Sequence, residues 1–393
     1  MLTPESSPYY EHKLCFANAA SPRAPGSVVL PKPSTSIEDY QLQIGYRKYV
    51  TKTTIPDDAK RINFIFLHGN GMNKGIWHYH INQIYAKYAS VPNMYIDTVL
   101  APDHINMCDS GYVNAGKLGA ICDWNDIAKD YVQLVKTQEK KSFLHPQAFN
   151  VIVAHSMGGF IALQVTASEP NLFHCSVLIN PVCVSNPEAD PGFVTYQKDW
   201  YNRGYVKLNY EVKQGEDWYN KVYDHFQNKS FYRGFQPTIL KDMMEDEIPD
   251  GYKRNQYYPN VQLKHDGYQD YVSYYSQYQS IPEGYPSYER VKVPTRILSG
   301  EKDLSGKLIG KLRDERLKHA QLHELKGQYH NMHASSPDLI LSLLDEFVVE
   351  TYNKNEKLND FTYLKKYGKN YKQIMFETRL KEFLGDIKFQ SKL

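Results

Sequence analysis

The sequence has no long apolar run and no targeting segment at its start. The opening residues, MLTPESSPYYEHKL, lack the apolar core of a secretory signal peptide. No run elsewhere approaches the roughly 18 apolar residues that a membrane-spanning helix needs. We therefore expect a protein that is made and kept inside the cell and has no transmembrane segment.

Closely spaced cysteines are absent as well. The chain has five cysteines, and they are scattered, odd in number and without C-x-x-C spacing: Cys15, Cys108, Cys122, Cys175 and Cys183. This pattern excludes the common zinc sites and favours a reducing compartment. We expect neither a metal nor another cofactor.

An excess of charge of one sign is also missing. The formal net charge is +2, and acidic and basic residues are interspersed along the chain. Such a chain produces no field that would favour nucleic acid, so we expect no nucleic-acid partner. Apolar residues make up 41% of the 393 residues, which is enough to build the core of one large or two medium domains.

Apolar runs and helical patterns alternate along the first half of the chain. INFIFLHG, MYIDTVLAP, FNVIVAHS and CSVLINPV read as strands, and amphipathic segments lie between them. Strand, helix and strand in that order predict an α/β fold with a mostly parallel sheet covered by helices on both faces.

The alternation stops after residue 183 and returns near residue 292. The interval is polar and holds 17 of the 33 tyrosines, so we interpret it as a mostly helical cap over the site. The predicted division has five parts: an extended lead-in (1–38), the first part of the core (39–183), the cap (184–291), the second part of the core (292–350) and a helical extension (351–393).

Residues 151–160, VIVAHSMGGF, are typical of a strand that turns sharply into a helix with a nucleophilic serine at the apex. Ala154 stands where the usual G-x-S-x-G pattern has its first glycine. The residues two before and two after the serine must be small, and alanine adds only one methyl group. Ser156 is therefore the candidate nucleophile.

A serine nucleophile needs two backbone N–H groups to stabilise the oxyanion of its tetrahedral intermediate. Met157 follows the serine directly at the start of a helix, where the dipole also favours negative charge. The second donor is expected in the glycine-rich loop HGNG after a buried strand, where we assign it to Asn70.

The acid and the base are expected later in the chain, in the order nucleophile, acid, histidine. RILSGEKDLS puts Asp303 on a loop after a strand, with Glu301 as its rival. The next strand leads to QYHNMHASS, where His330 is the preferred base and His333 the alternative. The other loop that can carry the acid, after SVLIN, holds Asn180, which cannot ionise.

The segments FIFLHGNGMNKGIW, VIVAHSMGGFIAL, SEPNLFH and HASSPDL together resemble the α/β-hydrolase superfamily, and within it the peroxisomal lipases of yeast. The resemblance implies an α/β-hydrolase fold and cleavage of carboxylic esters of lipids through an acyl-enzyme intermediate. It also implies Ser156 as nucleophile and His330 as base.

The chain closes on Ser391, Lys392 and Leu393, a tripeptide that the peroxisomal import receptor reads at a free carboxyl terminus. We expect localisation in the peroxisome matrix, with the import receptor as a partner. The spacing of Phe376, Leu380, Phe383, Leu384 and Ile387 predicts a docked amphipathic helix just before the tripeptide.

Two other functions stay open on the residues alone. The first is an acyl-CoA thioesterase, which needs cations for the phosphates of coenzyme A; ERVKV offers Arg290 and Lys292 near the end of the cap. The second is a hydrolase fold kept as a non-catalytic binding protein, which usually loses the serine or the histidine.

Overall fold

The computed structural model describes most of the chain. The described residues are 7–29, 41–185, 202–208, 217–253, 256–304, 306–359, 370, 373–374 and 376–377. Contacts divide the chain into two units, Met1–Phe347 and Val348–Leu393. The elements that carry the site belong to the first unit.

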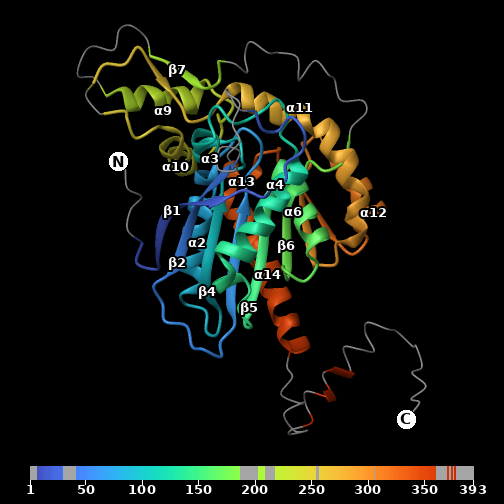
Figure 1. Cartoon of the computed structure of the whole chain (residues 1–393). Coiled ribbons are helices and arrows are strands. Elements are labelled where there is room, and N and C mark those ends of the chain that lie inside the picture. The colour runs from blue at the N-terminus through green and yellow to red at the C-terminus, as the bar shows by residue number, and fades with distance from the viewer. Residues whose placement is uncertain are drawn as a thin grey trace. The chain divides into compact units, whose positions relative to one another are not determined.

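An eight-stranded sheet forms the centre of the first unit (Figure 1). Its order is β1-β2-β4-β3-β5-β6-β9-β10. The bounds are β1 Tyr10–Asn18, β2 Gln43–Thr51, β3 Arg61–Leu67, β4 Tyr95–Pro102, β5 Ala148–His155, β6 Cys175–Ile179, β9 Thr295–Gly300 and β10 Gln321–Leu325.

The strands from β4 to β10 run parallel, and β1 and β2 are antiparallel to their neighbours. All residues of β6 and β9 are buried, as expected for strands covered on both faces. The predicted α/β fold with a mostly parallel sheet is confirmed. Because β5, β9 and β10 are parallel, their carboxyl ends lie at one edge of the sheet, where the candidate site residues follow them.

The amino-terminal segment differs from the predicted lead-in. Residues Tyr10–Asn18 form β1, an edge strand paired with β2 along nine residues. Its outer residues Leu14 and Phe16 stay 43% and 45% exposed. Only Tyr10 and Ala17 of the segment YEHKLCFAN are buried, so it lacks a continuous apolar run and apolar patterning did not identify it.

Helices cover the sheet and connect its strands. They are η1 Lys74–Trp77, α2 His78–Tyr88, α3 Cys108–Val113, α4 Trp124–Gln133, η2 Leu134–Gln138, α5 Lys140–Phe143, α6 Met157–Ser168, α12 Gly306–Glu315, α13 Met332–Ser335 and α14 Pro337–Asn359. The helix after the candidate nucleophile, α6, is apolar on nearly all sides and is buried along most of its length.

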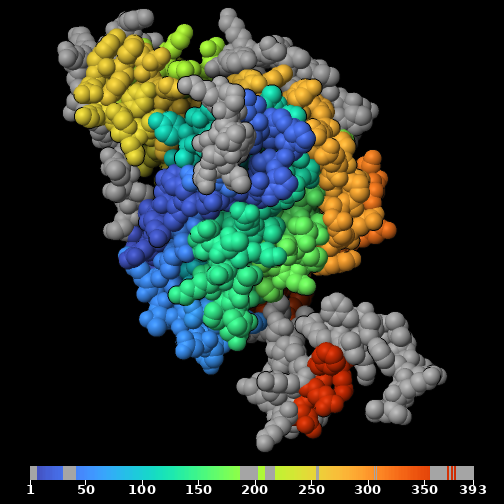
Figure 2. Space-filling model, viewed as in Figure 1, coloured from blue at the N-terminus to red at the C-terminus, as the bar shows by residue number. Residues whose placement is uncertain are grey.

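The described residues of the predicted cap form three α-helices, a short 3-10 helix and a two-stranded ribbon. In Figure 1, β7, α9 and α10 gather beyond one end of the sheet, and Figure 2 shows α9 and α10 as a yellow patch on the surface. The bounds are β7 Tyr205–Lys207, α9 Trp218–Asn228, α10 Pro237–Glu247, β8 Asn260–Gln262, α11 Gly267–Gly284 and η3 Tyr285–Arg290. The exact division at residues 183 and 291 stays a prediction.

Little of the carboxyl-terminal tail is described. Phe376 is the described member of the predicted docked face, and it is 65% exposed. The other members of that face and the tripeptide Ser391-Lys392-Leu393 lie outside the described residues. Among the described residues, no helix combines the length and apolar character needed to cross a membrane.

Candidate active site

Ser156 stands at the turn between β5 and α6. Its backbone has φ 55° and ψ −119°, a conformation that costs a non-glycine residue about 1–3 kcal/mol. Three backbone hydrogen bonds hold this turn: the Ser156 N–H donates to Ile179 O, and Ser156 O accepts from the N–H groups of Gly159 and Val182. The predicted strained turn is therefore present, with the serine at its apex.

Close packing explains the small residues around Ser156. A Cβ at Gly158 would lie 2.7 Å from the carbonyl oxygens of both Leu67 and His68 at the end of β3. Ala154 is fully buried in β5 and pairs with Leu67 and Leu178 on the neighbouring strands. The close approach that requires glycine is thus between α6 and β3, and the sheet accommodates the methyl group of Ala154.

A chain of two hydrogen bonds links Ser156, His330 and Asp303. The Ser156 hydroxyl lies 2.9 Å from His330 Nε2, and His330 Nδ1 lies 2.8 Å from Asp303 Oδ2. With its proton on Nδ1, His330 donates to Asp303 and accepts from Ser156. The side chain of Asp303 is 5% exposed and that of His330 is 35% exposed, so the pair is open to a ligand on the His330 side.

Glu301 and His333, the alternatives for the acid and the base, take no part in these two hydrogen bonds. Glu301 Oε2 accepts the backbone N–H of Gly327 at 2.7 Å, and it has no contact with His330 among the described hydrogen bonds. The ring of His333 is fully buried, and its centre lies 3.9 Å from that of His155 and 5.0 Å from that of Trp77. Burial holds the pKa of His333 well below its usual value.

The two segments that carry the candidate oxyanion donors adjoin Ser156. A Cβ at Gly69 would lie 3.1 Å from the Cβ of Ser156, so the loop before Asn70 runs directly past the serine. Among the described residues, neither the Asn70 nor the Met157 backbone N–H has a hydrogen-bond partner. Two free donors beside the serine are suited to an oxygen atom of a ligand.

Asn180 connects the loops that carry Asp303 and His330, a role that its position in the sequence did not indicate. Its Nδ2 donates to the carbonyl oxygens of Tyr329 and His330, at 3.1 and 2.8 Å, and its Oδ1 accepts the Gly300 N–H at 2.8 Å. This buried amide therefore ties the loop of Asp303 to the loop of His330. The sequence signal is a polar residue that ends an apolar strand, at a position where an acid is expected.

A hollow of about 690 Å³ opens beside His330 and Asp303. Val182, Phe235 and Leu304 contribute apolar surface to its lining. Arg233 and Lys302 add two exposed cations. An apolar hollow against a histidine and a carboxylate can hold an acyl group, and the cations can meet an anionic part of the same ligand.

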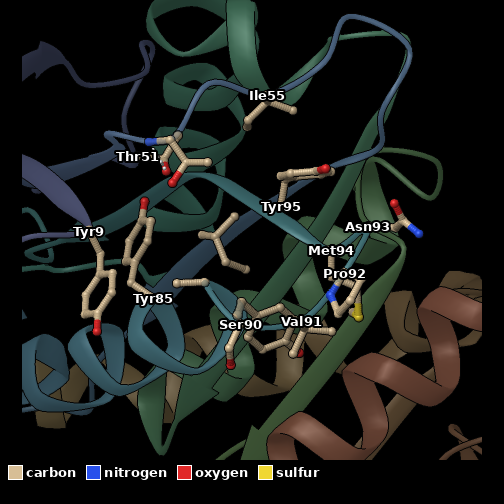
Figure 3. Close-up of a pocket in the computed structure, with 14 residues that line it drawn as sticks. Tyr9, Thr51, Ile55, Tyr85, Ser90, Val91, Pro92, Asn93, Met94 and Tyr95 are labelled. Carbon is tan, nitrogen blue, oxygen red and sulfur yellow. Dashed lines mark hydrogen bonds between the residues drawn. The ribbon is translucent and has the colours of Figure 1, made fainter.

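A second hollow, of about 290 Å³, lies at the opposite edge of the sheet (Figure 3). Tyr95 at the amino end of β4, Tyr85 of α2 and Ile55 line it. None of its lining residues is a histidine, cysteine, acid, lysine or arginine. Its hydroxyl groups, such as that of Ser90, therefore have no base within the lining to activate them.

The described residues include one group of side chains with metal-ligand character, Asp103, Cys108 and Asp109. The ammonium of Lys74 occupies the place of a cation there. Its Nζ lies 2.8 Å from Asp103 Oδ2 and also bonds Asp109. The cluster is thus a buried ion-pair network: Lys264 Nζ also lies 2.7 Å from Asp109 Oδ1, so two lysines face the two carboxylates.

Many histidines are buried in the neutral form. Burial, as the largest cause, lowers the pKa of nine of them in the described chain: His12, His68, His78, His80, His104, His155, His174, His225 and His333. Acid has the opposite effect on stability at five groups whose pKa is raised, because the folded chain binds their protons more tightly than the unfolded chain does. These groups are Asp103, Asp130, Asp242, Glu245 and His265. The histidines outnumber them.

We expect the free energy of unfolding to fall as the pH drops below about 6.5, the usual pKa of histidine. In the unfolded chain these histidines bind protons below a pH of about 6.5. In the folded chain the pKa values of His80 and His104 are about 4, so these two imidazoles bind protons only at a much lower pH. Each proton bound only by the unfolded chain lowers stability by about 1.4 kcal/mol per pH unit. Urea unfolding at several pH values between 7.5 and 5 measures this slope.

His333→Phe is the matched variant for that slope. Phenylalanine keeps a ring between His155 and Trp77 and removes one histidine. We therefore expect the slope of unfolding free energy against pH to decrease by about 1.4 kcal/mol per pH unit, the contribution of one proton. Equal slopes in the two proteins, or equal unfolding midpoints at pH 7.5 and 5.5 in the unchanged protein, would contradict the expectation.

Comparison with known proteins agrees with this geometry. Residues 64–343 match the alpha/beta hydrolase family. The chain is 34% identical over 228 residues to the peroxisomal membrane protein LPX1 of Saccharomyces cerevisiae, covering 56% of this chain and 53% of that protein. It is 25% identical over 222 residues to the type I acyl-CoA thioesterase mpaH' of Penicillium brevicompactum, covering 56% of this chain and 47% of that one.

These alignments span about half the length of the curated relatives. Among solved structures, the peroxisomal alpha-beta-hydrolase Lpx1 from Saccharomyces cerevisiae superposes with a TM-score of 0.72 at 25% identity, covering 88% of this chain and 91% of that one. The family match extends from β3 into α14 and includes all the candidate site residues. The chain belongs to the alpha/beta hydrolase family.

Proposed function

We propose that the protein is a serine hydrolase that cleaves carboxylic esters of lipids through an acyl-enzyme intermediate. The observation that carries the proposal is the unbroken chain from the Ser156 hydroxyl through His330 to Asp303, at 2.9 and 2.8 Å. Serine is a weak nucleophile until a base accepts its proton, and this arrangement supplies that base.

In the first half of the reaction the Ser156 oxygen attacks the ester carbonyl carbon while its proton moves to His330 Nε2. The carboxylate of Asp303 stabilises the imidazolium and keeps its Nδ1–H in place. The carbonyl oxygen becomes an oxyanion, which the N–H groups of Met157 and Asn70 receive. The ester C–O bond then breaks, and His330 returns the proton to the leaving alcohol.

In the second half a water molecule attacks the acyl group on Ser156. His330 accepts a proton from the water, and the second tetrahedral intermediate uses the same two N–H donors. Its collapse releases the carboxylic acid and restores the serine hydroxyl. The strained backbone of Ser156 supports both halves because it holds the hydroxyl clear of the strand, within reach of His330.

A lipid substrate is supported by the apolar lining of the hollow beside His330, contributed in part by Val182, Phe235 and Leu304. We further propose a peroxisomal location, because the relative LPX1 carries that location in its name. The tripeptide Ser391-Lys392-Leu393 would serve as the address where it stands at a free carboxyl terminus. A fluorescent fusion with and without the tripeptide tests the location.

Labelling with a fluorophosphonate probe tests the function. We expect the probe to modify Ser156, because it reacts with serines that an adjacent base activates. Peptide mapping identifies the labelled residue, and p-nitrophenyl acyl esters measure hydrolysis in parallel. A folded protein that neither reacts with the probe nor hydrolyses any of these esters would instead be a non-catalytic binding protein.

An acyl-CoA thioesterase is the second candidate. The relative mpaH' is a type I acyl-CoA thioesterase, and Arg233 and Lys302 at the hollow could meet the phosphates of coenzyme A. The sequence had pointed to Arg290 and Lys292 instead. Arg290 contacts Ala167 O at the far end of α6, about 15 Å of helix away from Ser156.

Turnover of palmitoyl-CoA and of a neutral glyceride separates the two candidates. If thioesters are the substrate, the double variant Arg233→Ala and Lys302→Ala should raise KM for palmitoyl-CoA by about tenfold, the effect of losing 1.4 kcal/mol of charge-assisted contacts. KM for a p-nitrophenyl ester, which has no phosphate, should stay the same. Equal changes for both substrates would show that the cations do not recognise coenzyme A.

A further inference from the structure

The loop that carries Asn70 is held by side chains from the cap. Asn70 Nδ2 donates to Asp270 Oδ1 at 3.0 Å and to Asp270 O at 3.3 Å. Asp270 lies on α11 and is 1% exposed, and Asn70 is 4% exposed. The side chain of the proposed oxyanion residue is therefore anchored to a helix 200 residues later in the chain.

Asp270 is itself fixed by two partners. Arg203 donates to its Oδ2, and His265 Nε2 lies 3.3 Å from the same oxygen. Burial alone would raise the pKa of Asp270, but the Arg203 guanidinium and His265 outweigh it and hold the pKa below its usual value. The carboxylate is thus charged, and its charge is balanced within the cap.

Two further contacts attach the same loop to the cap. The Tyr232 hydroxyl donates to Gly71 O, and Asn73 Nδ2 donates to Glu247 Oε1 at 2.8 Å. Glu247 Oε2 in turn accepts the backbone N–H of His265 at 3.0 Å. His265 therefore connects the anchors of Asn70 and Asn73, so that the loop is held along its length.

The same helix also touches the residue that supplies the other proposed donor. Ser273 Oγ donates to Met157 Sδ at 3.3 Å. Asp270 and Ser273 are three residues apart, which places both on one face of α11. One face of a single helix thus contacts both Asn70 and Met157.

We infer that α11 positions the oxyanion site, and that Asp270 is the positioning residue that fixes the backbone N–H of Asn70. This inference rests on the proposed serine-hydrolase function. An oxyanion donor must be held within about 0.5 Å of its productive place, and a glycine-rich loop does not hold itself so tightly. The buried hydrogen bond from Asn70 to Asp270 provides that restraint.

Asn70→Ala tests the inference with little risk to the fold, because it keeps the backbone N–H and leaves Asp270 paired with Arg203 and His265. We expect kcat to fall about 10- to 100-fold, somewhat less than the loss of a whole oxyanion donor, with KM within about threefold. The inhibition constant of an alkyl trifluoromethyl ketone, whose adduct carries an oxyanion, should rise by the same factor as kcat/KM falls.

Two variants of Asp270 complete the test. Asp270→Asn keeps an acceptor for Asn70 and should retain more activity than Asp270→Ala. The combination of Asn70→Ala with Asp270→Ala should lose little more than the stronger single variant, because both changes remove the same side-chain hydrogen bond between Asn70 and Asp270. Rates are referred to the fraction of protein that a fluorophosphonate titrates, so a loss of folded protein does not count as a loss of kcat.

Unchanged kcat and an unchanged inhibition constant in Asn70→Ala would overturn the inference. So would additive losses in the double variant. These failures are distinct from failure of the proposed function, in which Ser156→Ala would keep full activity or the unchanged protein would hydrolyse no ester at all.

Discussion

Ser156→Ala is expected to lower kcat for p-nitrophenyl acyl esters by about 10⁴- to 10⁶-fold, to the level that binding and oxyanion stabilisation alone provide. The physical reason is the loss of the nucleophile, since alanine has no oxygen to attack the carbonyl carbon. His330 remains in place, hydrogen-bonded to Asp303, but has no serine hydroxyl from which to accept a proton. Steady-state rates over a range of enzyme concentrations measure the effect.

Ser168→Ala is the matched control for this variant. Ser168 lies at the other end of α6, is exposed, and bonds only Val165 O among its described contacts. We expect it to keep the unchanged rate within a factor of about two, as an exposed substitution away from the site. Circular dichroism checks that both variants are folded. If folded Ser156→Ala hydrolysed esters at the full rate, Ser156 would not be the nucleophile.

Asp303→Asn is expected to lower kcat by about 10³- to 10⁴-fold. An asparagine amide facing His330 Nδ1 donates a hydrogen bond there, so it favours the tautomer whose proton is on Nε2. That tautomer cannot accept the proton of Ser156, although the three side chains keep nearly the same positions. Rates measured from pH 6 to 9 show whether the loss persists at high pH, as a wrong tautomer requires.

Glu301→Gln is the control for Asp303→Asn. Its oxygen accepts the Gly327 N–H, a bond that glutamine also makes, so we expect a change of at most about threefold. The reverse outcome, a large loss in Glu301→Gln with Asp303→Asn nearly unchanged, would assign the acid to Glu301. A large loss in both variants would show that the whole loop is sensitive to charge.

The sequence was most informative where a function depends on neighbouring residues. The turn at Ser156 follows from an apolar strand, small residues and an apolar helix, all within VIVAHSMGGF. The order of strands and helices from β3 to β6 follows from patterns of the same short range. The edge strand β1 was not predicted because only two of its nine residues, Tyr10 and Ala17, are buried, which leaves no apolar pattern to detect.

The choice between rivals required contacts across long stretches of chain. Asp303 and Glu301 are two residues apart, and the sequence preferred Asp303 by its place on the loop. Only the fold brings Asp303 to His330 and turns Glu301 towards Gly327. His330 and His333 are separated in the same way, because one meets Ser156 and the other is buried against Trp77.

The contacts of Asn180 and Asp270 could not be foreseen from any local pattern. Asn180 reaches His330 across 150 residues, and Asp270 reaches Asn70 across 200. Such pairs are chosen by the packing of the cap and the sheet, to which each local segment contributes only a part.

By itself the sequence determined the α/β fold, the strained serine turn and the order of serine, acid and histidine, because these follow from short-range periodicity and chain direction. The tertiary structure alone decided which histidine meets Ser156, which acid meets that histidine, and which cap residues hold the loop of Asn70. The reason is that hydrogen bonds of about 3 Å depend on the exact placement of segments far apart in the chain.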